Sequence, residues 1–103
     1  MLKLCPNPTF EAEVKITVPG QPAPESVFIT FKHFDKSAMS EFVEKAKDMD
    51  DIAAVSTVVM GWREIDQPFT PENLVLLLKN FPASAGEVMR VFYRESLESR
   101  AKN

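Results

Sequence analysis

The side chains best suited to chemistry in this sequence are few and scattered. The chain has one histidine, His33, and one cysteine, Cys5. A histidine becomes a catalytic base when a nucleophile lies within hydrogen-bond reach, and no recognisable serine or cysteine nucleophile motif surrounds His33. A single cysteine excludes an internal disulfide and fits a reducing compartment. We therefore interpret both side chains as structural, assign no catalytic residue and expect no enzymatic activity.

The aspartates at positions 48, 50 and 51 could suggest a divalent metal ion. They lack the central glycine and distal glutamate of a calcium loop, and helix capping explains them better. The three glycines are isolated at positions 20, 61 and 86, so the chain has no glycine-rich phosphate loop. The sequence therefore predicts no metal, no cofactor and no nucleotide site.

The charge balance argues against nucleic-acid partners. The formal net charge is −3, whereas a general nucleic-acid binder needs a basic face. Basic residues do gather near the C-terminus, at Arg90, Arg94, Arg100 and Lys102, where they complement the C-terminal end of a helix. No apolar run approaches the ~20 residues that span a bilayer, and no signal sequence is recognisable. We expect a cytoplasmic protein that binds neither nucleic acid nor membrane.

An α+β class is predicted, with an N-terminal antiparallel β-hairpin followed by a bundle of about four α-helices. The length of residues 1–103 suits a single domain, with the lead-in and hairpin in 1–34 and the helical part in 35–103. Apolar and polar residues alternate from Phe10 to Val18, and a second strand runs from about Ser26 to Phe34 after a proline-rich loop. Two strands are marginal in water, so the helices or another copy of the chain must complete them.

Two helices are predicted after the hairpin. Asp35 is the N-cap of an amphipathic helix from Lys36 to Met49. The segment from Ile52 to Met60 has two interpretations, because its β-branched residues favour a strand while its alanines and acidic start favour a helix. We take the helix, with Asp50-Asp51 as its cap and Gly61 as a left-handed C-terminal residue.

Two more helices are predicted after the only tryptophan, Trp62, which we interpret as a core anchor. Thr70 caps the helix from Pro71 to about Phe81, whose consecutive leucines predict the central core helix. Ser84 to Glu87 has the pattern of a capping box for a last helix from Ala85 to about Arg100.

The last helix is apolar over an arc of roughly 240°, which is wider than one core face requires. This arc contains Met89, Phe92 and Tyr93, and methionine and aromatic residues are enriched where helices are gripped by partners. Core packing alone explains the arc equally well. We take these three residues as candidate partner-binding residues.

Several short motifs follow one another in an order that is informative as a set. They are Asn7-Pro8-Thr9-Phe10, Gly61-Trp62-x-x-Ile65-Asp66, Pro68-Phe69-Thr70-Pro71-Glu72-Asn73-Leu74, Asn80-Phe81-Pro82 and Ser99-Arg100-Ala101-Lys102-Asn103. In this order and at these lengths the chain resembles the tail assembly chaperones of long-tailed, siphovirus-type bacteriophages and prophages. The residues that we take as the structural signature are Gly61, Trp62, Asp66, Phe69, Thr70 and Pro71. Many members have a longer insertion where this chain has only Gln67, so properties of that insertion do not transfer.

The resemblance implies a non-catalytic assembly factor of the host cytoplasm that is absent from the mature virion. Such chaperones coat and solubilise the tape measure protein, recruit tail tube protein subunits and self-associate into homo-oligomers. The alternative is a structural virion component, such as a head–tail connector or a minor tail protein. Family genes are often read through a −1 ribosomal frameshift, and Ala101-Lys102-Asn103 is compatible with the slippery heptamer A-AAA-AAC.

Overall fold

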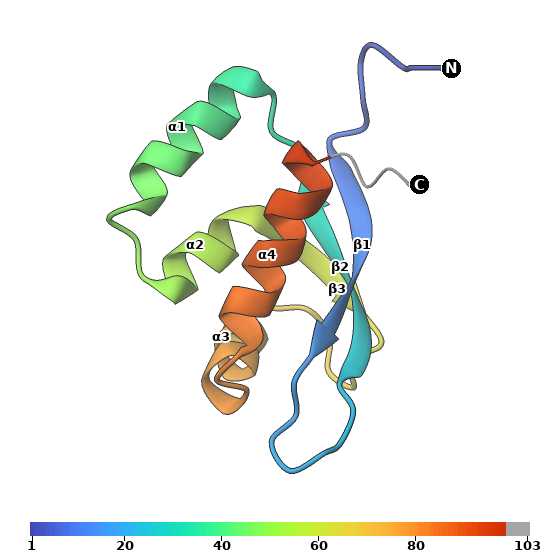
Figure 1. Ribbon diagram of the computed structural model, residues 1–103, viewed down its shortest axis with the longest axis vertical. Helices are drawn as coiled ribbons and strands as arrows, with labels where there is room; N and C mark the ends of the chain where they lie inside the picture. Colours follow the sequence, from blue (N-terminus) through green and yellow to red (C-terminus); the bar gives the residue numbers. More distant parts are fainter. Residues whose placement is uncertain (99–103) are drawn as a thin grey trace.

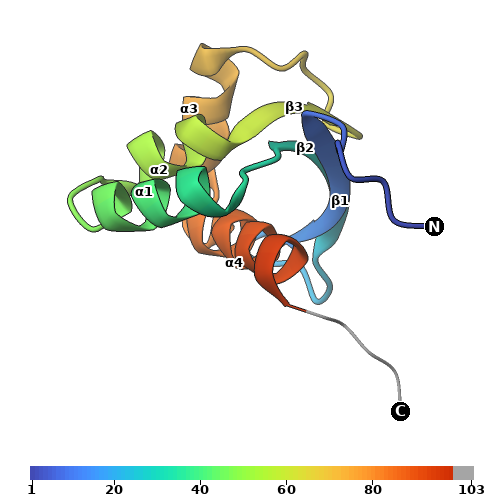
Figure 2. The ribbon, with the colours of Figure 1, turned by 90° about the horizontal axis from the view of Figure 1, so that it is seen from above.

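A curved antiparallel sheet forms one side of the molecule, and helices fill its concave face (Figures 1 and 2). The computed structural model describes residues 1–98. The α+β class is confirmed, with three strands and four helices in the order β1-β2-α1-α2-β3-α3-α4. The last helix ends at Leu97, three residues before the predicted end near Arg100. The motif Ser99-Arg100-Ala101-Lys102-Asn103 lies outside the described residues.

The predicted β-hairpin is confirmed. Strand β1 (Thr9–Ile16) pairs antiparallel with β2 (Glu25–Lys32) without interruption. The apolar residues of β1 face the helices, and Val14 is fully buried, as the alternating pattern requires. Gly20 lies in the connecting loop with a φ of 86°, a conformation that glycine adopts without steric cost.

A third strand follows the second helix without a loop. Helix α2 (Asp51–Val58) passes directly into β3 (Val59–Arg63), which pairs antiparallel with β2. Both interpretations of the segment from Ile52 to Met60 are therefore partly correct. The left-handed role of Gly61 is wrong, because this residue lies within β3 opposite Thr30 and the positive φ occurs at Glu64. The third strand supplies partners for β2 along its second edge, which a two-stranded hairpin would leave open.

Three helix starts follow the predicted capping pattern. The side chains of Asp35, Asp50 and Thr70 accept hydrogen bonds from backbone N–H groups three residues later, at 2.8, 2.8 and 3.0 Å. These bonds satisfy donors that a helix N-terminus leaves without partners. Helix α1 (Lys36–Ala46) ends three residues before the predicted Met49.

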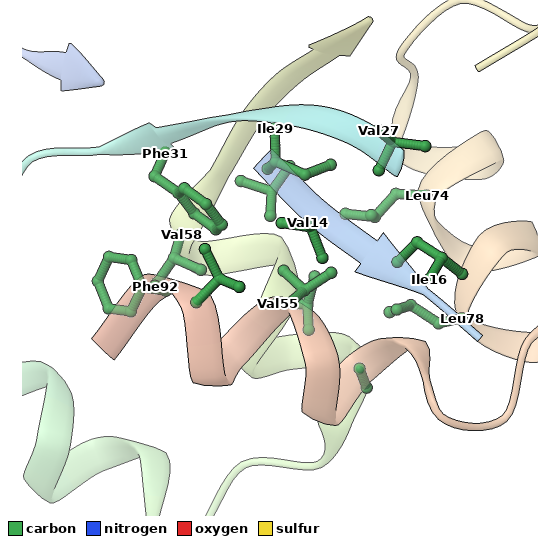
Figure 3. Close-up of a cluster of buried hydrophobic side chains, with 14 of the residues drawn as sticks. Val14, Ile16, Val27, Ile29, Phe31, Val55, Val58, Leu74, Leu78 and Phe92 are labelled. Carbon is green, nitrogen blue, oxygen red and sulfur yellow. The ribbon is translucent and has the colours of Figure 1, made fainter. Parts of the chain in front are cut away.

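The predicted central core role of the leucine-rich helix is wrong. Only Leu74 and Leu78 of α3 (Pro71–Asn80) are buried, whereas the side chain of Leu76 is 54% exposed. The helix that crosses the concave face is α4 (Ser84–Leu97), which Figure 2 shows against the sheet. Figure 3 shows its side chains among those of β1 and β2 in the core. The fully buried side chains are Phe31, Phe92, Ile29, Leu74, Val14, Val55, Val58, Val88 and Ser84.

The capping box predicted for the last helix is also wrong. Ala83 is the N-cap and makes no side-chain cap bond. Ser84 is instead fully buried, and its hydroxyl donates to the carbonyl oxygen of Leu77 at 3.3 Å. The carboxylate of Glu87 reaches the end of β1, where it accepts from the backbone N–H of Thr17 at 3.0 Å and from the hydroxyl of the same residue. Tertiary contacts therefore replace the local cap.

The different burial of α3 and α4 gives a stability prediction. Phe92→Ala should lower the free energy of unfolding by about 3–5 kcal/mol, because it opens a cavity in a close-packed core. Leu76→Ala, on the exposed side of α3, should change it by less than about 0.5 kcal/mol. Urea unfolding followed by circular dichroism measures both values, and equal effects would contradict the assignment of α4 as the central helix.

Candidate partner-binding surface

The width of the apolar arc on α4 has a structural explanation. The ring of Phe92 has no exposed surface, and its centroid lies 5.6 Å from the rings of Phe31 and Phe34 and 6.0 Å from that of Phe42. These partners come from the sheet, from the residues before α1 and from α1 itself. The helix is thus enclosed on two sides, and packing within the chain accounts for Phe92.

The other two candidate residues lie at the margin of this packing. Tyr93 is half-buried, with its ring 5.4 Å from that of Phe92 and 6.3 Å from that of Phe42. Burial raises the pKa of the Tyr93 hydroxyl above its ordinary value. Met89 is also half-buried against the core. These two residues, unlike Phe92, offer side-chain surface to another molecule.

The indole of Trp62 packs against the ring of Phe69, another of the signature residues. Its Nε1–H donates to the carbonyl oxygen of Gln67 at 2.9 Å, and the ring of Phe69 packs nearly perpendicular to it at 5.1 Å. The side-chain amide of Asn73 donates to the carbonyl oxygen of Pro68 at 2.9 Å. The segment between β3 and α3 is therefore held by its own hydrogen bonds. Trp62 is half-buried and anchors this segment from one side.

A small hollow of about 180 Å³ opens beside Trp62, and we call it the Trp62 groove. Its lining is Trp62, Ile65, Asp66, Gln67, Asn73, Leu76, Leu77, Asn80 and Phe81. The lining combines apolar side chains with one carboxylate and three side-chain amides, a combination typical of ligand-binding pockets. Sequence reasoning missed it because the leucine run of α3 was assigned to the core. The one signal was that five consecutive apolar residues cannot all face the inside of a surface helix.

The face of the sheet that points away from the helices carries one ion pair that spans all three strands. Arg63 on β3 donates two hydrogen bonds, each 2.9 Å, to the carboxylate of Glu11 on β1. Between the two outer strands, the guanidinium of Arg63 lies 4.0 Å from the ring centroid of Phe28 on β2, which is a favourable cation–π distance. The hydrogen bond from Arg63 lowers the pKa of Glu11, and that bond in turn raises the pKa of Arg63.

The remaining side chains considered from the sequence do not converge. His33 and Cys5 are exposed. Within residues 1–98 no group of three or more histidine, cysteine, aspartate or glutamate side chains could hold a metal ion. Over the same range no helix has the length and apolar character to cross a membrane. Arg100 and Lys102, from the predicted basic tail, lie outside the described residues.

A family model described as phage tail assembly chaperone matches residues 1–103. No curated protein and no solved structure matches the chain.

The ion pair across the sheet predicts a pH-dependent contribution to stability. Because Arg63 lowers the pKa of Glu11 from its ordinary value of 4.5, the pair stabilises the fold above that pH, and its contribution is lost as the pH falls below it. The stability difference between the wild type and Glu11→Gln should therefore shrink between pH 6 and about pH 3. Urea titrations across this range measure it, with Glu25→Gln as the control because the Glu25 side chain is exposed and forms no ion pair with another described residue.

Proposed function

This chain belongs to the phage tail assembly chaperone family, and we propose that it binds the tape measure protein and keeps it soluble while tail tube subunits are recruited. The observation that carries the proposal is the match of the family model to the whole sequence, residues 1–103. We further propose that it works without catalysis in the cytoplasm of the infected bacterium and is absent from the mature virion.

The surface chemistry supports a protein partner with apolar helices. Apolar side chains lie next to polar ones on the Met89–Tyr93 side of α4 and in the Trp62 groove. An amphipathic helix binds by placing its apolar face into such a surface. Methionine and tyrosine suit this task because the first adapts its shape and the second offers a polar tip. We propose that the tape measure protein contacts Met89 and Tyr93 first.

Helix α1 stands next to this surface and is held mainly by aromatic packing. Phe42 of α1 contacts Phe34, Phe92 and Tyr93, and Figure 1 shows α1 at the periphery of the molecule. A partner helix that displaced α1 would gain access to the buried ring of Phe92. Phe92 therefore takes part in binding only in such a displaced state, whereas Met89 and Tyr93 are accessible at once.

Co-expression with the tape measure protein tests the proposal. The wild-type chain should raise the soluble fraction of the tape measure protein and co-purify with it. Met89→Ala combined with Tyr93→Ala should reduce co-purification by at least about tenfold, which corresponds to about 1.4 kcal/mol of lost binding free energy. Met60→Ala is the matched control, since it removes an exposed apolar side chain that belongs to neither surface. Leu76→Ala separately tests the Trp62 groove.

The controls separate binding from folding. The double variant should have the same circular dichroism spectrum as the wild type. Both side chains are only half-buried, so their truncation should leave the fold intact. Loss of co-purification with Leu76→Ala but not with the double variant would move the binding site to the Trp62 groove. A tape measure protein that stays insoluble beside the wild-type chain would contradict the proposed function.

The proposed absence from the mature virion has its own measurement. Mass spectrometry of purified particles should detect tail tube and tape measure peptides but none from this chain. Peptides present at the stoichiometry of a structural protein would instead favour a connector or a minor tail protein.

A further inference from the structure

Within residues 1–98, strand β1 has one long and regular edge without a neighbouring strand. It is the outer member of the sheet order β1-β2-β3, and its eight residues pair with β2 without a bulge. None of its residues is proline, and its helix-facing side chains are all apolar. Proteins that prevent strand addition at such an edge use prolines, bulges or inward-pointing charges. Strand β1 has none of these three devices, so its edge is open to an added strand.

The register shows which backbone groups of β1 point outward. The N–H of His33 donates to the carbonyl oxygen of Pro8 at 2.8 Å, so the even-numbered residues of β1 point their N–H and carbonyl groups toward β2. In an antiparallel ladder the backbone direction alternates at each residue. The odd-numbered residues Glu11, Glu13 and Lys15 therefore present theirs at the open edge. No described residue accepts a hydrogen bond from these three N–H groups.

Glu87 sets one end of this open edge. Its carboxylate accepts from the outward N–H of Thr17 at 3.0 Å and from the hydroxyl of the same residue. Because α4 occupies the edge at this point, an added strand must end before Thr17. The edge that remains, from Thr9 to Lys15, is roughly 20 Å long at about 3.3 Å per residue. A short extended segment of about seven residues fits this length.

The open edge borders a groove of about 520 Å³ between β1 and α4. Four carboxylates line the groove, and each of them already has a partner within the chain. The pairs are Glu11 with Arg63 at 2.9 Å, Glu13 with the hydroxyl of Ser26 at 2.6 Å, Glu87 with Thr17 at 3.0 Å and Glu95 with Arg94 at 3.4 Å. The groove therefore has no free carboxylate for a cation of a partner.

Two of the three cations that line the groove are in the opposite situation. Arg94 pairs with Glu95, whereas Lys15 and Arg90 form neither an ion pair nor a side-chain hydrogen bond with a described residue. Arg90 is exposed and belongs to the helix on the concave side of the sheet. A guanidinium in such a place suits a carboxylate, to which it can donate two hydrogen bonds.

We propose that the β1 edge binds an extended segment of another protein, and that this segment carries a carboxylate on the side that faces α4. Its backbone pairs with the outward groups of Glu11, Glu13 and Lys15, as in other cases of strand addition. Its side chains alternate between two faces, and a carboxylate on the α4 side meets Arg90. The side chains on the other face lie opposite Glu11 and Glu13, where uncharged residues avoid repulsion.

A second copy of β1 does not have this chemistry. The side chains that it would turn toward α4 are Phe10, Ala12, Val14 and Ile16, and none of them is a carboxylate. Arg90 would keep no partner in such a pair. The site also differs from the surface of the proposed function, because neither Met89 nor Tyr93 lines this groove and the partner is a strand instead of an apolar helix.

A synthetic peptide tests the charge requirement. The probe is acetylated and amidated Thr-Val-Thr-Asp-Thr-Val-Thr, which places its aspartate and valines on one face, and a lysine replaces the aspartate in the second peptide. In nuclear magnetic resonance titrations the wild type should bind the aspartate peptide at least about tenfold more tightly than the lysine peptide. Arg90→Glu should reverse this preference. The gain of lysine-peptide binding also shows that the variant is folded.

Lys36→Glu is the matched control for the charge change. Lys36 is exposed on α1 and does not line the groove, so this variant has the same net charge as Arg90→Glu but should keep the wild-type preference. An equal loss of aspartate-peptide binding in both variants would reduce the effect to net charge and overturn the proposed contact with Arg90.

N-methylated peptides test the backbone pairing. Residues opposite each other in a sheet share a face, so the peptide threonines that lie opposite Glu11, Glu13 and Lys15 point their N–H groups toward β1. Methylation of these threonine nitrogens should abolish binding, whereas methylation of the valine nitrogens should leave it unchanged. The aspartate peptide should also slow amide hydrogen exchange at the same three residues of β1.

Three results would overturn the proposal. The first is a wild type that shows no binding of the aspartate peptide at about 1 mM. The second is equal binding of the peptides methylated at threonine and at valine. The third is protection of the Glu11, Glu13 and Lys15 amides that rises with protein concentration in the absence of peptide, because a second copy would then occupy the edge.

Discussion

The buried ring of Phe92 is the contact on which the arrangement of the helices depends. It touches the sheet through Phe31 and helix α1 through Phe42, with ring centroids 5.6 and 6.0 Å apart. Aromatic pairs at such distances add to the stabilisation that burial alone provides. Helix α1 has few other anchors, so its position follows from this ring. The candidate binding residues Met89 and Tyr93 lie on the same helix as Phe92, so the packing of this ring also fixes their positions.

The sheet gains its rigidity from contacts that cross strands. Arg63 reaches over Phe28 to Glu11 and so connects β3 to β1 across β2. The passage from α2 to β3 without a loop fixes the third strand relative to the helix layer. On the other side, Glu87 joins the start of α4 to the end of β1. The two faces of the sheet are thus tied to elements distant in sequence.

Features set by neighbouring residues were predictable from the sequence. The N-caps Asp35, Asp50 and Thr70 act within three residues of themselves, and the alternation in β1 reports a single buried face. Features set by tertiary contacts were not. The leucines of α3 indicated a central helix. No local sequence pattern shows that α4, and not α3, packs across the concave face of the sheet. Ser84 resembled a cap, but burial beside Leu77 determines its role. The Trp62 groove was missed for the same reason. It forms because α3 buries only one face in the core, while Leu76 and Leu77 on another face line the groove.

The central place of α4 has a consequence for synthesis on the ribosome. The strands that it covers are made first, and the residues that fill their concave face come between Ser84 and Leu97. Until this helix has left the exit tunnel, the apolar side of the nascent sheet is covered only in part, by side chains of earlier elements such as Val55 and Val58. Vectorial synthesis thus gives each new chain an interval in which part of the apolar side of its own sheet is exposed.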